Sequence, residues 1–66
     1  MKIIESMKTT DAMSSDELWI ATKIHEGAVG LSVSVTGDGD YDIFLTPGDA
    51  ERILAMLRGA IEKAGQ

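Results

Sequence analysis

The sequence predicts an α+β protein: an antiparallel β-meander of three strands, or four if residues 1–16 supply one, followed by one C-terminal α-helix packed on one sheet face. In residues 18–25 and 29–36 the large aliphatic residues recur at every second position, with Thr22 as the one exception, which is the period of a strand. Asp38-Gly39 then precedes a third alternating run, 41–45, and such a pair is typical of a hairpin turn. In 46–64 the apolar residues recur at the helical period instead.

The helix over 46–64 is the most clearly marked element. Thr46 suits the N-cap, Pro47 suits the first helical position, and Gly65 is expected to end the helix as a C′ residue. The apolar stripe of this helix consists of Ala50, Ile53, Leu54, Leu57, Ala60, Ile61 and Ala64. We expect the stripe to pack on a sheet face, called here the aliphatic face, made of Leu18, Ile20, Ile24, Leu31, Val33, Val35, Ile43 and Leu45.

The chain length of 66 residues allows one domain. We predict an N-terminal arm over 1–16, partly flexible or a short strand, and a single β-β-β-α domain over 17–66. A domain this small gains little net stability from its own core, and without cysteine it has no disulfide to add. Self-association is the remaining common source of stability, so we expect a homo-oligomer, in the simplest case a dimer.

Charge and hydropathy argue against nucleic acid and membranes as partners. Eleven acidic residues against six basic ones give a formal charge of −5, and no basic patch is present for nucleic acid. The N-terminus lacks the apolar run of a secretory signal, and no stretch is long and apolar enough to span a bilayer. We therefore expect a cytoplasmic protein that binds neither nucleic acid nor membrane.

The second sheet face has an unusual composition. This face, called here the aromatic face, carries Trp19, Ala21, Lys23, His25, Ser32, Ser34, Thr36, Asp42 and Phe44. A face in contact with water only would be polar throughout, yet this one holds the only Trp and the only Phe of the chain. It could be covered by the N-terminal arm, by a second subunit or by an external ligand, or the two aromatic side chains could remain half exposed. We expect Trp19, Ala21, Lys23, Ser32, Ser34 and Phe44 to form a binding or oligomer interface.

The back of the helix carries a small pair, Ala55 and Gly59, opposite the apolar stripe. A glycine there costs about 1 kcal/mol relative to alanine. Residues this small let a second backbone approach closely, so we add both to the candidate oligomer interface. The alternative is a tolerated surface glycine.

Two groups could carry chemistry. Asp38, Asp40 and Asp42 have the spacing of an EF-hand calcium loop, but its sixth position, which requires Gly, is Ile43, so a plain acidic hairpin is favoured and no metal is expected. His25 and Glu26 could act as acid and base, but neighbours on a strand point to opposite faces. No nucleophile elbow or phosphate loop is present. We predict no catalytic residue, no cofactor and no enzyme.

These features predict a small acidic, non-enzymatic protein-binding module, an oligomeric accessory or inhibitor protein that binds itself and another protein. The alternative is a binder of a nucleotide or metabolite whose pocket forms between subunits, with Trp19 or Phe44 stacking on a ring. A purely structural assembly subunit is a third possibility.

Overall fold

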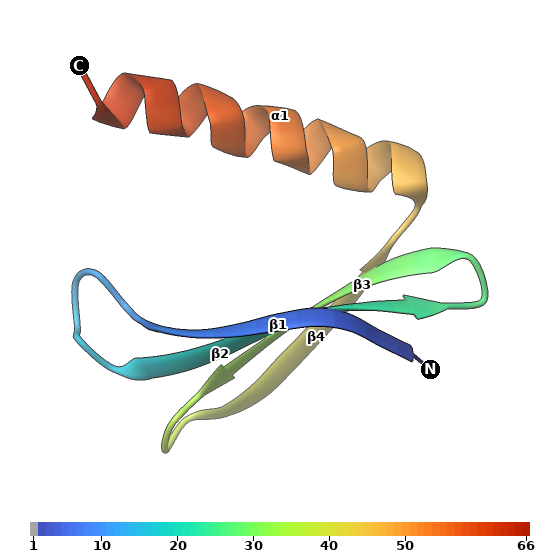
Figure 1. Ribbon diagram of the computed structural model, residues 1–66, viewed down its shortest axis with the longest axis horizontal. Coiled ribbons are helices and arrows are strands. Elements are labelled where there is room, and N and C mark those ends of the chain that lie inside the picture. Colours follow the sequence, from blue (N-terminus) through green and yellow to red (C-terminus); the bar gives the residue numbers. More distant parts are fainter. Residues whose placement is uncertain (1) are drawn as a thin grey trace.

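The computed structural model describes residues 2–66. Four strands form one antiparallel sheet in the order β1-β2-β3-β4, and a single helix, α1, follows them (Figure 1). The elements are β1 (Lys2–Thr10), β2 (Glu17–His25), β3 (Ala28–Val35), β4 (Gly39–Leu45) and α1 (Pro47–Ala64). This is the predicted fold class in its four-stranded form.

The N-terminal segment adds an edge strand to the sheet. β1 pairs with β2 over its whole length, from Lys2 opposite Ile24 to Thr10 opposite Glu17, with a bulge between Ile3 and Glu5. The strand runs as far as Thr10 and is thus longer than the short strand expected in this arm. The loop after it is held by Asp11, whose carboxylate accepts hydrogen bonds from the backbone N–H groups of Met13 (2.8 Å) and Ser14 (3.0 Å). These two bonds hold the pKa of Asp11 below its ordinary value of 3.8.

The other two hairpins turn at residues with positive φ. Glu26 and Gly27 (φ 50° and 79°) form the two-residue turn between β2 and β3, the mirror-image type that matches strand twist. Between β3 and β4 the turn differs from the sequence prediction. Val35 pairs with Gly39, so Gly39 is already in the strand, and Gly37 (φ 86°) supplies the positive φ inside the loop.

The helix has the predicted start and end. The Thr46 side chain accepts a hydrogen bond from the Asp49 N–H at 3.2 Å, and Pro47 occupies the first turn. The helix ends at Ala64, and Gly65 has φ −82° and ψ −3°. Gly65 therefore ends the helix at the predicted place, in a right-handed conformation, and its N–H donates to the Ile61 carbonyl at 3.1 Å.

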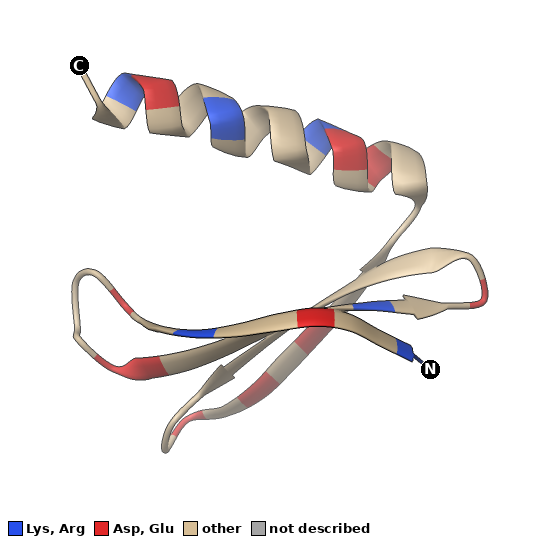
Figure 2. Ribbon diagram, in the orientation of Figure 1, with Lys and Arg blue, Asp and Glu red and all other residues tan. Residues whose placement is uncertain are grey.

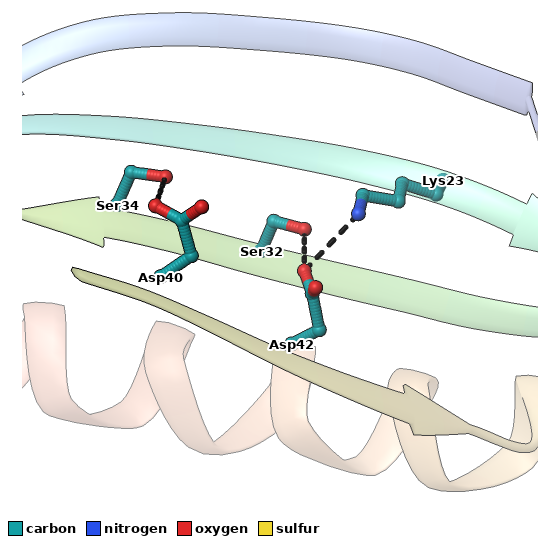
Figure 3. A network of polar contacts seen from close by, with 5 residues as sticks. All are labelled: Lys23, Ser32, Ser34, Asp40 and Asp42. Atoms are coloured by element: carbon teal, nitrogen blue, oxygen red, sulfur yellow. Dashed lines mark hydrogen bonds and ion pairs between the residues drawn. The ribbon is translucent and has the colours of Figure 1, made fainter.

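The helix packs on the sheet through β3 and β4, and the described residues show no contact of α1 with β1 or β2. In Figure 3 the aromatic-face side chains stand in front of the strands and α1 passes behind β4, so α1 lies on the aliphatic side. Ala50 and Ile53 of the stripe are half-buried there, and the rest of the stripe is exposed. Coverage of the sheet is thus less complete than the sequence predicts.

The molecule is expanded for its length. Its radius of gyration is 13.2 Å, against about 11 Å for a compact domain of this size. Among residues 2–66 only Ala21, Gly30 and Ser32 are buried. In that same part of the chain, no helix has the length and apolar character needed to cross a membrane.

Candidate functional site

The strand register brings the predicted site residues of the sheet onto one face. Across β2 and β3, Trp19 lies opposite Ser34, Ala21 opposite Ser32, and Lys23 opposite Gly30. Across β3 and β4, the partners are Ser34 with Asp40, Ser32 with Asp42, and Gly30 with Phe44. Directly opposed residues of an antiparallel pair point to the same side. Trp19, Ala21, Lys23, Ser32, Ser34 and Phe44 therefore share the aromatic face, and the register adds Gly30 and Asp40 to it.

A polar network occupies the centre of this face (Figure 3). The Ser32 hydroxyl and the Lys23 ammonium group (3.1 Å) both donate to the same oxygen of Asp42. The pKa of the Asp42 carboxyl is lowered from its ordinary value of 3.8. The hydrogen bond from Ser32 is the largest cause, and the hydrogen bond from Lys23 is the next. Beside them, the Ser34 hydroxyl donates to Asp40 at 2.7 Å. The acidic residues of β4 thus bind the serines of β3.

Phe44 closes one end of the face by lying across Gly30. A Cβ atom at Gly30 would come within 2.8 Å of Phe44 Cε1 and 3.3 Å of Lys23 Cβ, so only glycine fits beneath the ring as it lies. The ring also lies near His25, with ring centroids 6.2 Å apart and ring planes tilted by 59°. Phe44 remains 45% exposed.

Trp19 stands at the opposite end of the face. It is 36% exposed and borders an open hollow of about 150 Å³ that is also lined by Lys8, Glu17, Leu18 and Thr36. Lys23, the neighbour of Phe44, follows Trp19 by four residues on β2, which is about 13 Å along a strand. The two aromatic residues therefore form separate contact points, with the polar network between them.

The remaining candidates lie elsewhere. Ala55 and Gly59 are exposed on α1, and a Cβ at Gly59 would meet nothing within 4 Å. Asp38 is exposed in the β3–β4 loop, and within residues 2–66 no three side chains of the metal-binding types come together. His25 Nε2 and Glu26 Oε2 are 3.8 Å apart at an exposed turn.

Gly30 and the two serine–carboxylate pairs were missed by reasoning from the sequence. The signal was available in the alternation itself: Gly30, Ser32 and Ser34 are the small positions of β3, and Asp40, Asp42 and Phe44 are the same-face positions of β4. Placing the turn at the correct residues would have set them opposite one another, because register follows from the turn.

The aromatic face has features of a protein-contact surface. Phe44 and Trp19 offer partly exposed rings, of the type enriched in interfaces. Between them Lys23 is paired with Asp42, and Asp40 accepts a hydrogen bond from the Ser34 hydroxyl. Comparison with protein-family models, with curated proteins and with solved structures found no match.

Proposed function

We propose that this chain is a small acidic, non-enzymatic protein-binding module of the cytoplasm, an accessory or inhibitor protein that acts as a homo-oligomer. Its interactions are with copies of itself and with another protein. The proposal rests on the extent of surface that a single chain leaves in contact with water.

The accessible surface of the chain is 5435 Å². A monomeric protein with a mass of 7.1 kDa is expected to expose about 4,100 Å². The difference, about 1,300 Å², exceeds the roughly 800 Å² that each partner buries in a standard protein–protein interface. Much of the exposed surface is apolar, since Ile3, Ile4, Met7, Leu57 and Ile61 are each at least half exposed. Apolar surface of this extent is typical of interaction sites.

A small-molecule site receives less support. The hollows of the sheet measure about 230 Å³ and about 150 Å³ and both are open. Ligand pockets usually enclose about 300–1,000 Å³. A partner protein, in contrast, can bind to a shallow surface that presents partly exposed aromatic side chains, and the aromatic face has such side chains.

The solution mass tests the proposal most directly. Sedimentation equilibrium over a range of concentrations should give a multiple of the 7.1 kDa chain mass. A single-chain mass at every concentration would contradict the homo-oligomer. For the second partner, proteins captured by the native chain should be lost with Trp19→Ser/Phe44→Ser and kept with Met13→Ser, a change in an exposed loop. An unchanged set of captured proteins would contradict binding through the aromatic face.

A further inference from the structure

The apolar stripe of α1 becomes more exposed with distance from β4. Ala50 and Ile53, near the start of the helix, are half-buried, whereas Leu54, Leu57 and Ile61 are 51%, 56% and 68% exposed. The helix begins at the end of β4 and contacts only β3 and β4 within residues 2–66. Its N-terminal half therefore covers its own sheet, and the C-terminal half of the stripe faces water.

A complementary apolar surface lies on the other half of the sheet. On β1 and β2, Met7 pairs with Ile20, and Ile24 is the next large aliphatic residue of that face. Met7 and Ile24 are 55% and 48% exposed. Between the two strands lies a hollow of about 230 Å³, lined by Glu5, Ser6, Met7, Ile20, Ala21 and Thr22. A cavity of about 150 Å³ already holds benzene, so this hollow can hold an aliphatic side chain.

Geometry indicates that one helix cannot cover this face. Strands are about 4.8 Å apart, so the outer strands of a four-stranded sheet are separated by roughly 14 Å. A helix with its side chains is about 10–12 Å wide and covers two or three strands. With α1 on β3 and β4, the surface of β1 and β2 has room for a second helix.

The distribution of charge favours a helix of this same chain. The charges of α1 balance, because Asp49, Glu51 and Glu62 are matched by Arg52, Arg58 and Lys63 (Figure 2). The whole formal charge of −5 therefore lies on residues 1–45. Two sheets placed face to face would repel, whereas the neutral helix can approach a second sheet. Glu5, at the rim of the hollow, also offers an opposite charge to Arg58 or Lys63.

We propose that a second copy of this chain completes the core: Leu57 and Ile61 in the C-terminal half of α1 pack into the β1–β2 hollow of the partner, and the partner's helix does the same in return. The arrangement has two-fold symmetry and closes after two chains. It rests on the proposed function, since it specifies how the homo-oligomer forms. The helix is then shared, its N-terminal half on its own sheet and its C-terminal half on the partner's.

Cysteine trapping tests this contact without destabilising the fold, because the chain has no native cysteine. Ile61→Cys and Met7→Cys are prepared as two separate single variants, mixed and oxidised. A disulfide requires Cα atoms within about 7 Å, so the mixture should give a cross-linked pair that contains one chain of each variant. Ala55→Cys, on the opposite side of the helix, should give no such pair with Met7→Cys.

A second set of variants measures the same contact by mass. Leu57→Glu and Met7→Glu should each reduce the solution mass to that of one chain, because each places a carboxylate in the hollow. Ala55→Glu introduces the same side chain on the opposite side of α1 and should leave the mass unchanged. Circular dichroism establishes that each variant retains its helix and sheet.

The outcomes separate this contact from the proposed function. If the native chain is oligomeric but the cross-link fails and Ala55→Glu, not Leu57→Glu, dissociates it, the helix contact is wrong and the homo-oligomer stands. If the native chain is a monomer, and a double Met7→Cys/Ile61→Cys chain forms its disulfide internally, the chain's own helix closes the sheet and both proposals fail.

Discussion

The fully buried residues of the described chain lie on the less hydrophobic of the two sheet faces. Ala21, Gly30 and Ser32, the buried residues of the described chain, all belong to the aromatic face, which carries the polar network. On the aliphatic face Ile24 and Ile43 remain 48% and 36% exposed. A small residue is buried within one layer when long neighbours lie over it, as Phe44 does over Gly30. A large aliphatic residue needs a second layer.

The two faces are closed in different ways. The centre of the aromatic face is closed by packing and hydrogen bonds within one chain, so substitutions that remove them should lower the stability of the fold, whereas the rings of Trp19 and Phe44 remain partly exposed. The aliphatic face, by our inference, is closed by a second chain, so substitutions there should change assembly. Each variant below is therefore measured both for unfolding and for solution mass, at fixed protein concentration, because assembly itself adds to apparent stability.

The largest effect is expected from Gly30→Val. The new side chain would require Phe44 to move, since even a Cβ lies within 2.8 Å of the ring. Overpacking in a well-packed core costs about 1–3 kcal/mol, and because the Phe44 ring is partly exposed we expect urea unfolding to show a loss of free energy near the lower end of that range. The solution mass should stay unchanged.

A double-mutant cycle identifies the cause. In Gly30→Val/Phe44→Ala the ring is absent, so the combined loss should be smaller than the two single losses added together. Strictly additive losses would show that Gly30 is constrained by something other than Phe44. A fall in solution mass would show that the aromatic face takes part in assembly after all.

The fold was predictable from the sequence because each element carried its own local signal. Alternation in β2 and β3, the Thr46-Pro47 start and the helical stripe gave the correct elements and order. β1 was only partly predicted, because it is an edge strand: pairing with β2, rather than a pattern of its own, holds Thr9 and Thr10 in the strand. The position of the β3–β4 turn was harder to predict. Both Gly37 and Gly39 have positive φ, but only Gly37 lies in the loop.

The candidate site was predictable as a face but not as a set of contacts. Alternation placed Trp19, Lys23, Ser32 and Phe44 together, and the register confirms it. Which of them touch depends on the register, which a local pattern does not determine to one residue. The exposure of the C-terminal half of the α1 stripe could not be predicted from the sequence either. An amphipathic pattern indicates that an apolar surface will be covered, but it does not identify which chain covers it.

A smaller effect, and one that depends on pH, is expected from Asp42→Asn. The carboxyl pKa is lowered in the folded protein, mainly by Ser32 and then by Lys23. A lowered pKa contributes stability that is complete above the ordinary value of 3.8 and disappears as the pH falls through the folded value. Thermal unfolding from about pH 6 to about pH 2 should therefore decline more steeply for the native chain than for Asp42→Asn.

Ser32→Ala serves as the matched variant for this linkage. It removes the largest cause of the lowered Asp42 pKa, so its acid decline should lie between those of the native chain and Asp42→Asn. Parallel curves for all three proteins would mean that the network of Ser32, Lys23 and Asp42 does not favour the charged carboxyl in solution.

The smallest effect is expected from Gly59→Ala, and the solution mass of this variant tests the back of the helix. A Cβ at Gly59 would meet nothing within 4 Å, so the substitution removes the helical cost of glycine without a clash. Unfolding should require up to about 1 kcal/mol more free energy, and the solution mass should not change. If instead Ala55 and Gly59 form the close helix contact that their size allows, the added methyl group would separate two backbones. The mass would then fall while the stability of the helix rose, and the surface that joins the chains would be the back of α1, not its stripe.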